Sequence, residues 1–254
     1  RPPPGCTRGL RVLHGELEID LANGRLEDED LQECCAWLQD QLPRQEGLRR
    51  DRDGRVLAMT VDISGNSIGD IGLHALLVTL HRLNVGVRKM KLFRNCLGQA
   101  AAHALADWIR RSPTALWELH LSHNFVPEDG FADIFAAIGE SGAYPMARFS
   151  SSKAPLWLRL ERNALASPAA FLAVAEEQLR RAAGAGVAPL LCVVRTWARG
   201  GCRSDACRLA RPGACPLVHV LYPETQCCDG PSPAAACRWR PGRPACEERQ
   251  RWSL

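Results

Sequence analysis

Cysteines are concentrated near the end of the chain, and four residues there have the spacing of metal ligands. Eight of the twelve cysteines lie from Cys192 onward. One subset follows the pattern Cys-x4-Cys-x7-Cys-x3-His, at Cys202, Cys207, Cys215 and His219. Three thiolates and one imidazole form a closed tetrahedral zinc site, and such a site can order a segment that lacks an apolar core. The spacing predicts one structural zinc ion. The alternative is a cysteine-rich disordered tail without a cofactor.

The order of these ligands and the final x3 spacing resemble a CCCH zinc finger, a family whose members often bind RNA. In that family the first gap is usually longer than the second, whereas here it is shorter. The aromatic residues expected to stack beside the ligands are limited to Trp197 and Tyr222. The resemblance implies that the tail contacts RNA, which is one alternative to a protein partner.

Other residues with chemical potential are few. His120 and His123 have the spacing of a metal-binding pair, with Glu118 nearby. Residues of a strand alternate between its faces, so the two imidazoles should point apart and serve as surface polar groups. The chain also lacks a nucleophile elbow, a phosphate-binding P-loop, a dinucleotide-binding glycine motif and an HExxH motif. We therefore predict that the protein is not an enzyme.

A repeated unit must position these residues. The stretches 87–97 and 116–126 both read LxxLxLxxNxL, with an aliphatic residue at every L, and they are 29 residues apart. The second L of each unit marks five such stretches, at Ile19, Val61, Met90, Leu119 and Leu158. The first and last intervals between these markers exceed 29 residues, which predicts inserted loops at 43–55 and 142–152.

Each unit should consist of a strand, a turn and a helix that cannot bury its apolar side alone. Helical spacing in the second unit places one apolar stripe on a single face, formed by Leu73, Leu76, Leu77 and Leu80. The turns carry asparagines at 66, 95, 124 and 163, whose amides can bond backbone groups that a turn leaves unpaired. Stacking the units would bury strand side chains against helix stripes in one core.

This pattern resembles leucine-rich repeat proteins of the ribonuclease-inhibitor type, over residues 16–181. The resemblance implies an α/β solenoid of about five units, with a concave parallel sheet, convex helices and an irregular Cys/Arg-rich C-terminal tail. Members of the class inhibit ribonucleases, sense ligands, stimulate GTP hydrolysis by small GTPases or act as scaffolds. Their shared property is binding through the concave strand face. The resemblance thus implies a non-enzymatic protein-interaction module.

The outward strand positions and their turns become basic and aromatic from the third unit onward, a composition favoured at binding hot spots. We predict that a protein partner contacts Lys89, Lys91, Phe93, Arg94, Trp117, His120, Trp157, Arg159 and Arg162. The inserted loops should extend this surface. A GTPase-activating protein is a further alternative, because Arg94 and Arg162 would lie on loops beside the concave edge.

Composition places the rest of the chain around this domain. Of 254 residues, 24% are charged and 46% hydrophobic, which is typical of a soluble globular protein. No apolar run has the length of a membrane helix and no signal peptide is recognisable, so we expect an intracellular protein, cytoplasmic or nuclear. The expected organisation is a disordered lead-in at 1–15, the repeat domain at 16–183, a linker with the zinc segment at 184–222 and a disordered tail at 223–254.

Overall fold

The computed structural model describes residues 3, 9–147, 153–183, 190–194, 202, 207 and 215–221. In this part of the chain an eight-stranded sheet has the order β1-β2-β3-β4-β5-β8-β10-β9. Its strands are β1 (Leu10–Leu13), β2 (Glu16–Asp20), β3 (Val56–Asp62), β4 (Val85–Lys91), β5 (Glu118–His120), β8 (Leu156–Arg159), β9 (Leu191–Val194) and β10 (Val218–Leu221). Every pairing in this sheet is parallel except that of β1 with β2.

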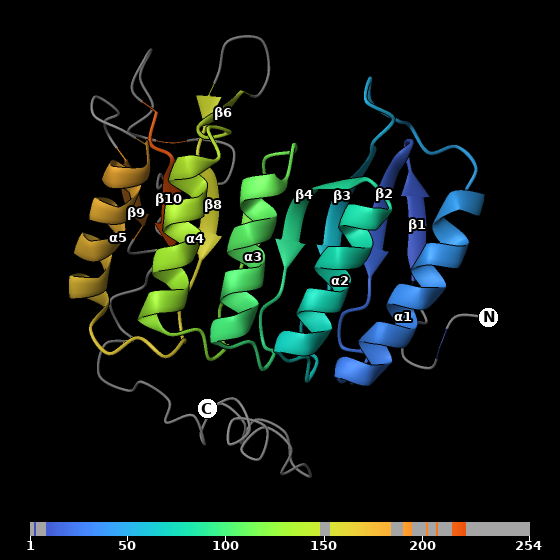
Figure 1. Ribbon diagram of the computed structural model, residues 1–254, viewed down its shortest axis with the longest axis horizontal. Helices are drawn as coiled ribbons and strands as arrows, with labels where there is room; N and C mark the ends of the chain where they lie inside the picture. The colour runs from blue at the N-terminus through green and yellow to red at the C-terminus, as the bar shows by residue number, and fades with distance from the viewer. Residues whose placement is uncertain are drawn as a thin grey trace.

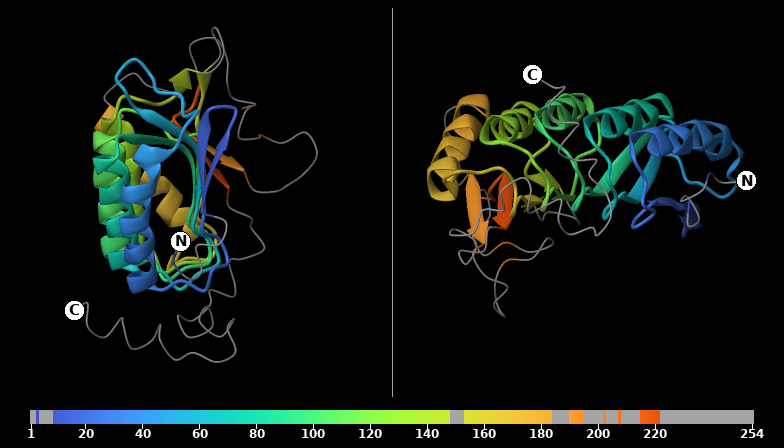
Figure 2. Two further views of the ribbon diagram at one scale, coloured as in Figure 1. Left: turned by 90° about the vertical axis from the view of Figure 1, so that its right-hand side faces the viewer. Right: turned by 90° about the horizontal axis from the view of Figure 1, so that it is seen from below.

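Helices connect consecutive strands and lie in a row along one face of the sheet (Figures 1 and 2). They are α1 (Asp28–Gln41), α2 (Asp70–Arg82), α3 (Gln99–Arg111), α4 (Glu128–Glu140) and α5 (Pro168–Ala183). A short 3-10 helix, η1 (Leu42–Arg44), follows α1, and β6 (Met146–Ala147) pairs with β7 (Lys153–Ala154) in a small antiparallel sheet. The opposite face of the main sheet carries no helix of the described residues, and we call it the helix-free face.

The register of the sheet confirms the phase read from the sequence. The five marker residues are neighbours across the sheet, because β2 pairs Ile19 with Val61, β3 pairs Val61 with Met90, and β4 pairs Met90 with Leu119. Leu119 in turn pairs with Leu158 of β8. Each unit therefore adds one strand in register with the last, and the architecture is a repeat-like α/β arrangement.

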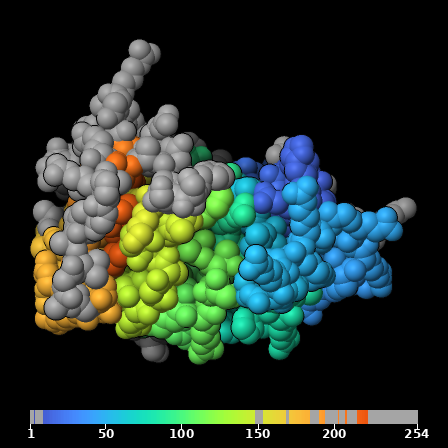
Figure 3. Space-filling view, turned by 90° about the horizontal axis from the view of Figure 1, so that it is seen from above, coloured from blue at the N-terminus to red at the C-terminus, as the bar shows by residue number. Residues whose placement is uncertain are grey.

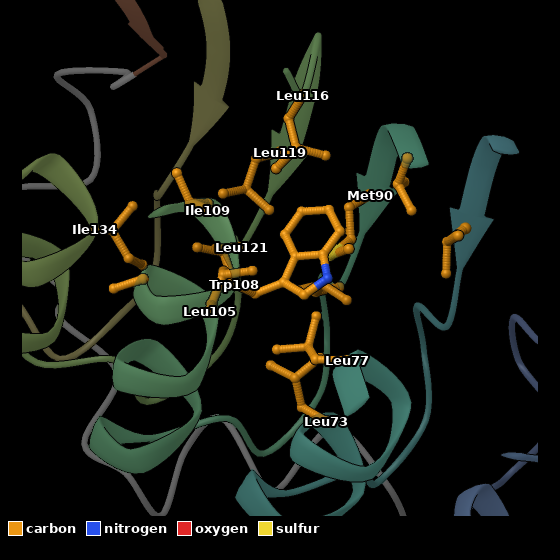
Figure 4. Packing of buried hydrophobic residues seen from close by; sticks show 14 of the residues in the cluster. Leu73, Leu77, Met90, Leu105, Trp108, Ile109, Leu116, Leu119, Leu121 and Ile134 are labelled. Carbon is orange, nitrogen blue, oxygen red and sulfur yellow. The ribbon is translucent and has the colours of Figure 1, made fainter. Parts of the chain in front are cut away.

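The main core lies between the sheet and the helices, as the apolar spacing predicts. Helix positions spaced three and four residues apart are fully buried at Leu73, Leu76 and Leu80 of α2. Figure 4 shows how Leu73 and Leu77 of α2 and Leu105 of α3 point toward Met90 of β4. The helical stripes and the inward strand residues thus form one continuous apolar layer.

The turn asparagines link each unit to the one before it. The Asn95 amide nitrogen donates to the carbonyl oxygens of Ile63 (3.0 Å) and Leu92 (3.1 Å), and its Oδ1 accepts from the Ile68 amide (3.2 Å). Asn124 makes the equivalent bonds one unit later. Because both side chains are buried, these amides satisfy backbone groups that water cannot reach. We call this series the asparagine ladder.

The order of the strands departs from chain order only at the C-terminal end. The last described strand, β10, lies between β8 and β9 rather than outside β9. In the space-filling view its orange-red atoms accordingly appear between the yellow and the lighter orange ones (Figure 3). The strand expected near Leu190 to Val194 is present as β9, whereas β10 falls in a segment that sequence analysis treated as irregular.

Candidate metal centre and strand face

Three cysteines and one histidine converge on the helix-free face at the C-terminal end of the sheet. They are Cys192, Cys202, Cys207 and His219, and one ligand atom from each lies within 4.8 Å of the others. We call them the cysteine–histidine cluster. Cys192, Cys202 and His219 are buried and Cys207 is half-buried. The arrangement is a compact, largely closed group of soft ligands.

Two of the ligands are placed by strand pairing. β9 and β10 are parallel, and their register sets Cys192 directly beside His219. His219 pairs on its other side with Trp157 of β8, and the two rings meet edge to face at 5.5 Å. The flanking residues Val218 and Val220 point into the main core. Strand alternation therefore forces His219 onto the helix-free face.

The other two ligands belong to the connection between β9 and β10. Cys202 and Cys207 pack with Cys192, Trp157 and Leu221 in an apolar cluster separate from the main core. The sulfur atoms of Cys192 and Cys202 are 3.7 Å apart. A disulfide needs about 2.05 Å between its sulfurs, so this is a contact between two thiols.

Burial and crowding control the ionisation of the cluster. Burial raises the pKa of the Cys192 thiol well above its usual range, and the nearby sulfurs of Cys207 and Cys202 raise it further. Three thiolates cannot coexist at such short distances without a cation between them. The cluster accordingly has the electrostatic character of a site for a positively charged metal ion.

The predicted ligand set is right in three members and differs in the fourth. Cys215 is not in the cluster, and its thiol donates to the Lys153 carbonyl oxygen at 3.5 Å. Burial raises the pKa of Cys215 to about 11, so this thiol keeps its proton. Cys192 occupies the fourth position, because β10 brings His219 beside β9. Sequence spacing gave no signal for Cys192 beyond its place on an expected strand.

Cysteines elsewhere in the described residues do not add to this cluster. Cys34 and Cys96 are disulfide-bonded. Cys35 is a buried thiol whose pKa burial raises to about 11. The pair His120 and His123, weighed above as a metal pair, is not part of any group of three or more metal-binding side chains within the described residues.

The remainder of the helix-free face is lined by charged residues that pair across neighbouring strands. Lys89 of β4 lies 2.9 Å from the carboxylate of Glu118 on β5, and Lys91 lies 3.2 Å from that of Asp62 on β3. The four side chains are partly buried. The acidic-to-basic gradient read from the sequence is thus an alternation of ion pairs when adjacent strands are compared.

The predicted partner-binding residues divide into three positions. Lys89, Lys91, His120 and Arg159 lie on the strands of the helix-free face, and Phe93 follows β4 with its ring 6.5 Å from that of His120. Arg94 and Arg162 lie in the turns after β4 and β8, both exposed and both with positive φ. The two tryptophans occupy the third position and are described next.

Trp117 and Trp157 differ in their accessibility. Trp117 is half-buried, and the Arg88 guanidinium lies 4.5 Å from its ring centroid while also bonding Glu16 at 2.6 Å. Trp157 is only 7% exposed and packs against Cys192 in the cysteine–histidine cluster. The cluster therefore covers Trp157 and limits the accessible part of the helix-free face to the strands before β8.

A basic turn row borders the same face at the strand ends. Arg94, His123 and Arg162 adopt the left-handed conformation at equivalent places in successive units. Burial lowers the pKa of His123, and the guanidinium groups of Arg162 and Arg94 lower it further. His123 is thus neutral at physiological pH, and the positive charge of this row resides on the arginines.

Comparisons with known proteins leave the family open. No helix among the described residues has both the length and the apolar character needed to cross a bilayer. A scan against models of known protein families finds no match to this chain.

Proposed function

We propose that this protein is a leucine-rich repeat module of the ribonuclease-inhibitor type that binds a protein partner on its helix-free face. The observation that carries the proposal is the one-sided cover of a parallel sheet. Parallel sheets normally have helices on both faces. Here α1 to α5 all lie on one face of the sheet, and the strands present charged and aromatic side chains on the other.

The strand register and the asparagine ladder support the repeat assignment. One strand, one turn asparagine and one helix recur with the marker residues paired across the sheet. This recurrence is the physical property expected of units that bury their apolar sides only by stacking. We infer a solenoid whose concave surface is the helix-free face.

The chemistry of the face favours a protein partner of mixed charge. Its half-buried ion pairs hold lysine and carboxylate side chains in fixed positions, so a partner meets an ordered pattern of both signs. Phe93 and Trp117 add aromatic area near the centre, and Arg94 and Arg162 add positive charge along the border. Acidic side chains of the partner should therefore face the basic turn row, with apolar groups against Phe93.

Site-specific photocrosslinking in the full chain tests where the partner binds. A photoreactive amino acid replaces Phe93 on the helix-free face in one variant and Ile71 on α2 in another. Ile71 is the matched control because it is an exposed apolar residue, 65% accessible, on the helix-covered side. We expect a crosslinked protein from position 93, competed by unlabelled chain, and none from position 71.

The same experiment contains the contrary result. A partner crosslinked only from position 71 would place the binding surface on the helices and would refute the proposal. Recovery of RNA instead of protein from position 93 would favour the nucleic-acid alternative. No observation on the described residues favours that alternative or a GTPase-activating role, and both remain predictions from sequence.

A further inference from the structure

We infer that Cys192, Cys202, Cys207 and His219 bind one structural Zn²⁺ ion that fastens the C-terminal end of the sheet. The first argument is distance. Zinc–sulfur bonds of about 2.3 Å in a tetrahedral site place two sulfur ligands about 3.8 Å apart. The sulfurs of Cys192 and Cys202 are 3.7 Å apart, and all four ligand atoms lie within 4.8 Å of one another. The side chains already have the separation that the metal requires.

The second argument is donor chemistry. Three thiolates and one imidazole are soft and borderline ligands, which select zinc over magnesium or calcium. Four protein ligands fill a tetrahedral shell and leave no position for water or substrate. The site is therefore structural. Its burial among Trp157, Leu221 and the strands excludes the water that would otherwise compete for the ion.

The third argument is the path of the chain. Crossovers between parallel strands are right-handed, and those from β2 to β8 place their helices on one face. The step from β9 to β10 runs back toward β8, in the opposite direction along the sheet. A right-handed crossover must then pass over the other face. This reversal explains why Cys202 and Cys207 lie on the helix-free face, above the strands that carry Cys192 and His219.

One ion in this position joins three parts of the chain. It links β9 through Cys192, β10 through His219, and the connection between them through Cys202 and Cys207. The insertion of β10 between β8 and β9 is thereby fixed by coordination as well as by strand pairing. The ion also covers Trp157 and so sets the C-terminal limit of the open face.

Zinc content of the full chain and of two cysteine variants tests this inference. Chain purified under reducing conditions should contain about one zinc per molecule. Cys192→Ser should lose that zinc, whereas Cys215→Ser should retain it. Cys215 is the matched control because it is equally buried and close to Cys207, yet it lies outside the cluster. The opposite result would establish the ligand set predicted from sequence spacing and overturn this one.

Cobalt substitution identifies the ligands without relying on a destabilised variant. Co²⁺ in the wild-type chain should give the intense visible bands of a tetrahedral thiolate site. His219→Cys keeps four ligands, so it should retain the metal and increase the thiolate-to-cobalt absorption by about one third. Unchanged absorption in that variant, or a wild-type chain without a tetrahedral spectrum, would overturn the inference.

Hydrogen exchange separates the metal centre from the proposed partner-binding function. Removing zinc with a chelator should accelerate amide exchange in β9 and β10 and leave β4 and α3 protected. Unchanged exchange in β9 and β10 would show that no ion fastens these strands. Because Phe93 lies on the opposite part of the sheet, crosslinking from that position can succeed or fail independently of the zinc result.

Discussion

Replacing Asn95 with alanine removes one step of the asparagine ladder from the middle of the molecule. The side chain is only 5% exposed and makes three hydrogen bonds to backbone groups. Two of these groups keep another donor after the change. The Ile63 carbonyl oxygen still accepts from Asn66 at 2.7 Å, and the Leu92 carbonyl oxygen still accepts from Asn124 at 3.0 Å.

The Ile68 amide has no such substitute. Its acceptor is Oδ1 of Asn95, and Ile68 is fully buried. Leaving a buried amide without an acceptor costs about 1–3 kcal/mol, and losing one of two donors at each carbonyl adds about 0.5 kcal/mol apiece. We therefore expect Asn95→Ala to lower the free energy of unfolding by about 2–4 kcal/mol. For a domain of this size that corresponds to a decrease of about 5–12 °C in melting temperature.

Asn163→Ala is the matched control at the end of the ladder. Asn163 accepts from the Val126 amide at 3.1 Å and donates to two carbonyl oxygens, but it is only half-buried. Water can replace part of these bonds, so we expect a loss of about 1 kcal/mol. Urea unfolding followed by circular dichroism measures both values. Equal losses, or a loss below about 0.5 kcal/mol for Asn95→Ala, would refute the assignment of a buried, water-excluded ladder.

Three further predictions follow from contacts in the core and on the helix-free face. Lys91→Glu places two carboxylates side by side and should cost about 1 kcal/mol, most of which Asp62→Lys in the same chain should restore, as a double-mutant cycle in urea would measure. Tyr144→Phe removes the buried hydroxyl that accepts from the Leu116 amide at 3.0 Å and should cost about 1–3 kcal/mol. Burial raises the pKa of Tyr144, so the unfolded chain alone ionises near pH 10; stability should fall by up to about 1.4 kcal/mol per pH unit above that value, and the phenylalanine variant should lose this part of the slope. Gly139→Ala puts a methyl group 2.7 Å from a side-chain carbon of α5 and should lower the melting temperature by several degrees, whereas a calorimetric scan without any decrease would show that α4 and α5 can separate at little cost.

The repeat could be predicted from sequence because each unit obeys the same local constraints. Spacing within one strand and one helix fixed which side chains face inward, and the recurrence of that spacing fixed the register between strands. Met90 and Leu119 could thus be assigned as neighbours without coordinates, and the structure pairs them. The bonds of Asn95 could be anticipated on the same basis, since a buried turn leaves backbone groups that only a side chain can satisfy.

The metal centre could be predicted only in part because its geometry depends on strand order. Spacing along the chain suggested Cys202, Cys207 and His219, which the structure brings together. The fourth ligand is chosen by which strand lies beside β10, and no local pattern encodes that neighbour. Cys192 is far from the other ligands in sequence yet adjacent to His219 in the sheet. Cys215 is close in sequence but turns toward Lys153.

The charged pairs of the helix-free face were missed for a similar reason. Reading each strand separately gives a run of acids followed by a run of bases. Reading across the strands, Lys89 faces Glu118 and Lys91 faces Asp62. Neutralisation between neighbours depends on register and side-chain reach, so a charge count along the chain overstates the field that a partner would encounter.

The asparagine ladder also makes the size of this molecule adjustable. Each asparagine reaches only the unit immediately before it, and those at 66, 95 and 124 are spaced 29 residues apart. Removing or duplicating one such period would return every remaining asparagine to the same kind of neighbour. The sheet would narrow or widen by one strand, about 4.8 Å, with its two ends unchanged. Gene-level gain or loss of a single period is therefore a route by which such a chain can change the reach of its binding face while keeping its fold.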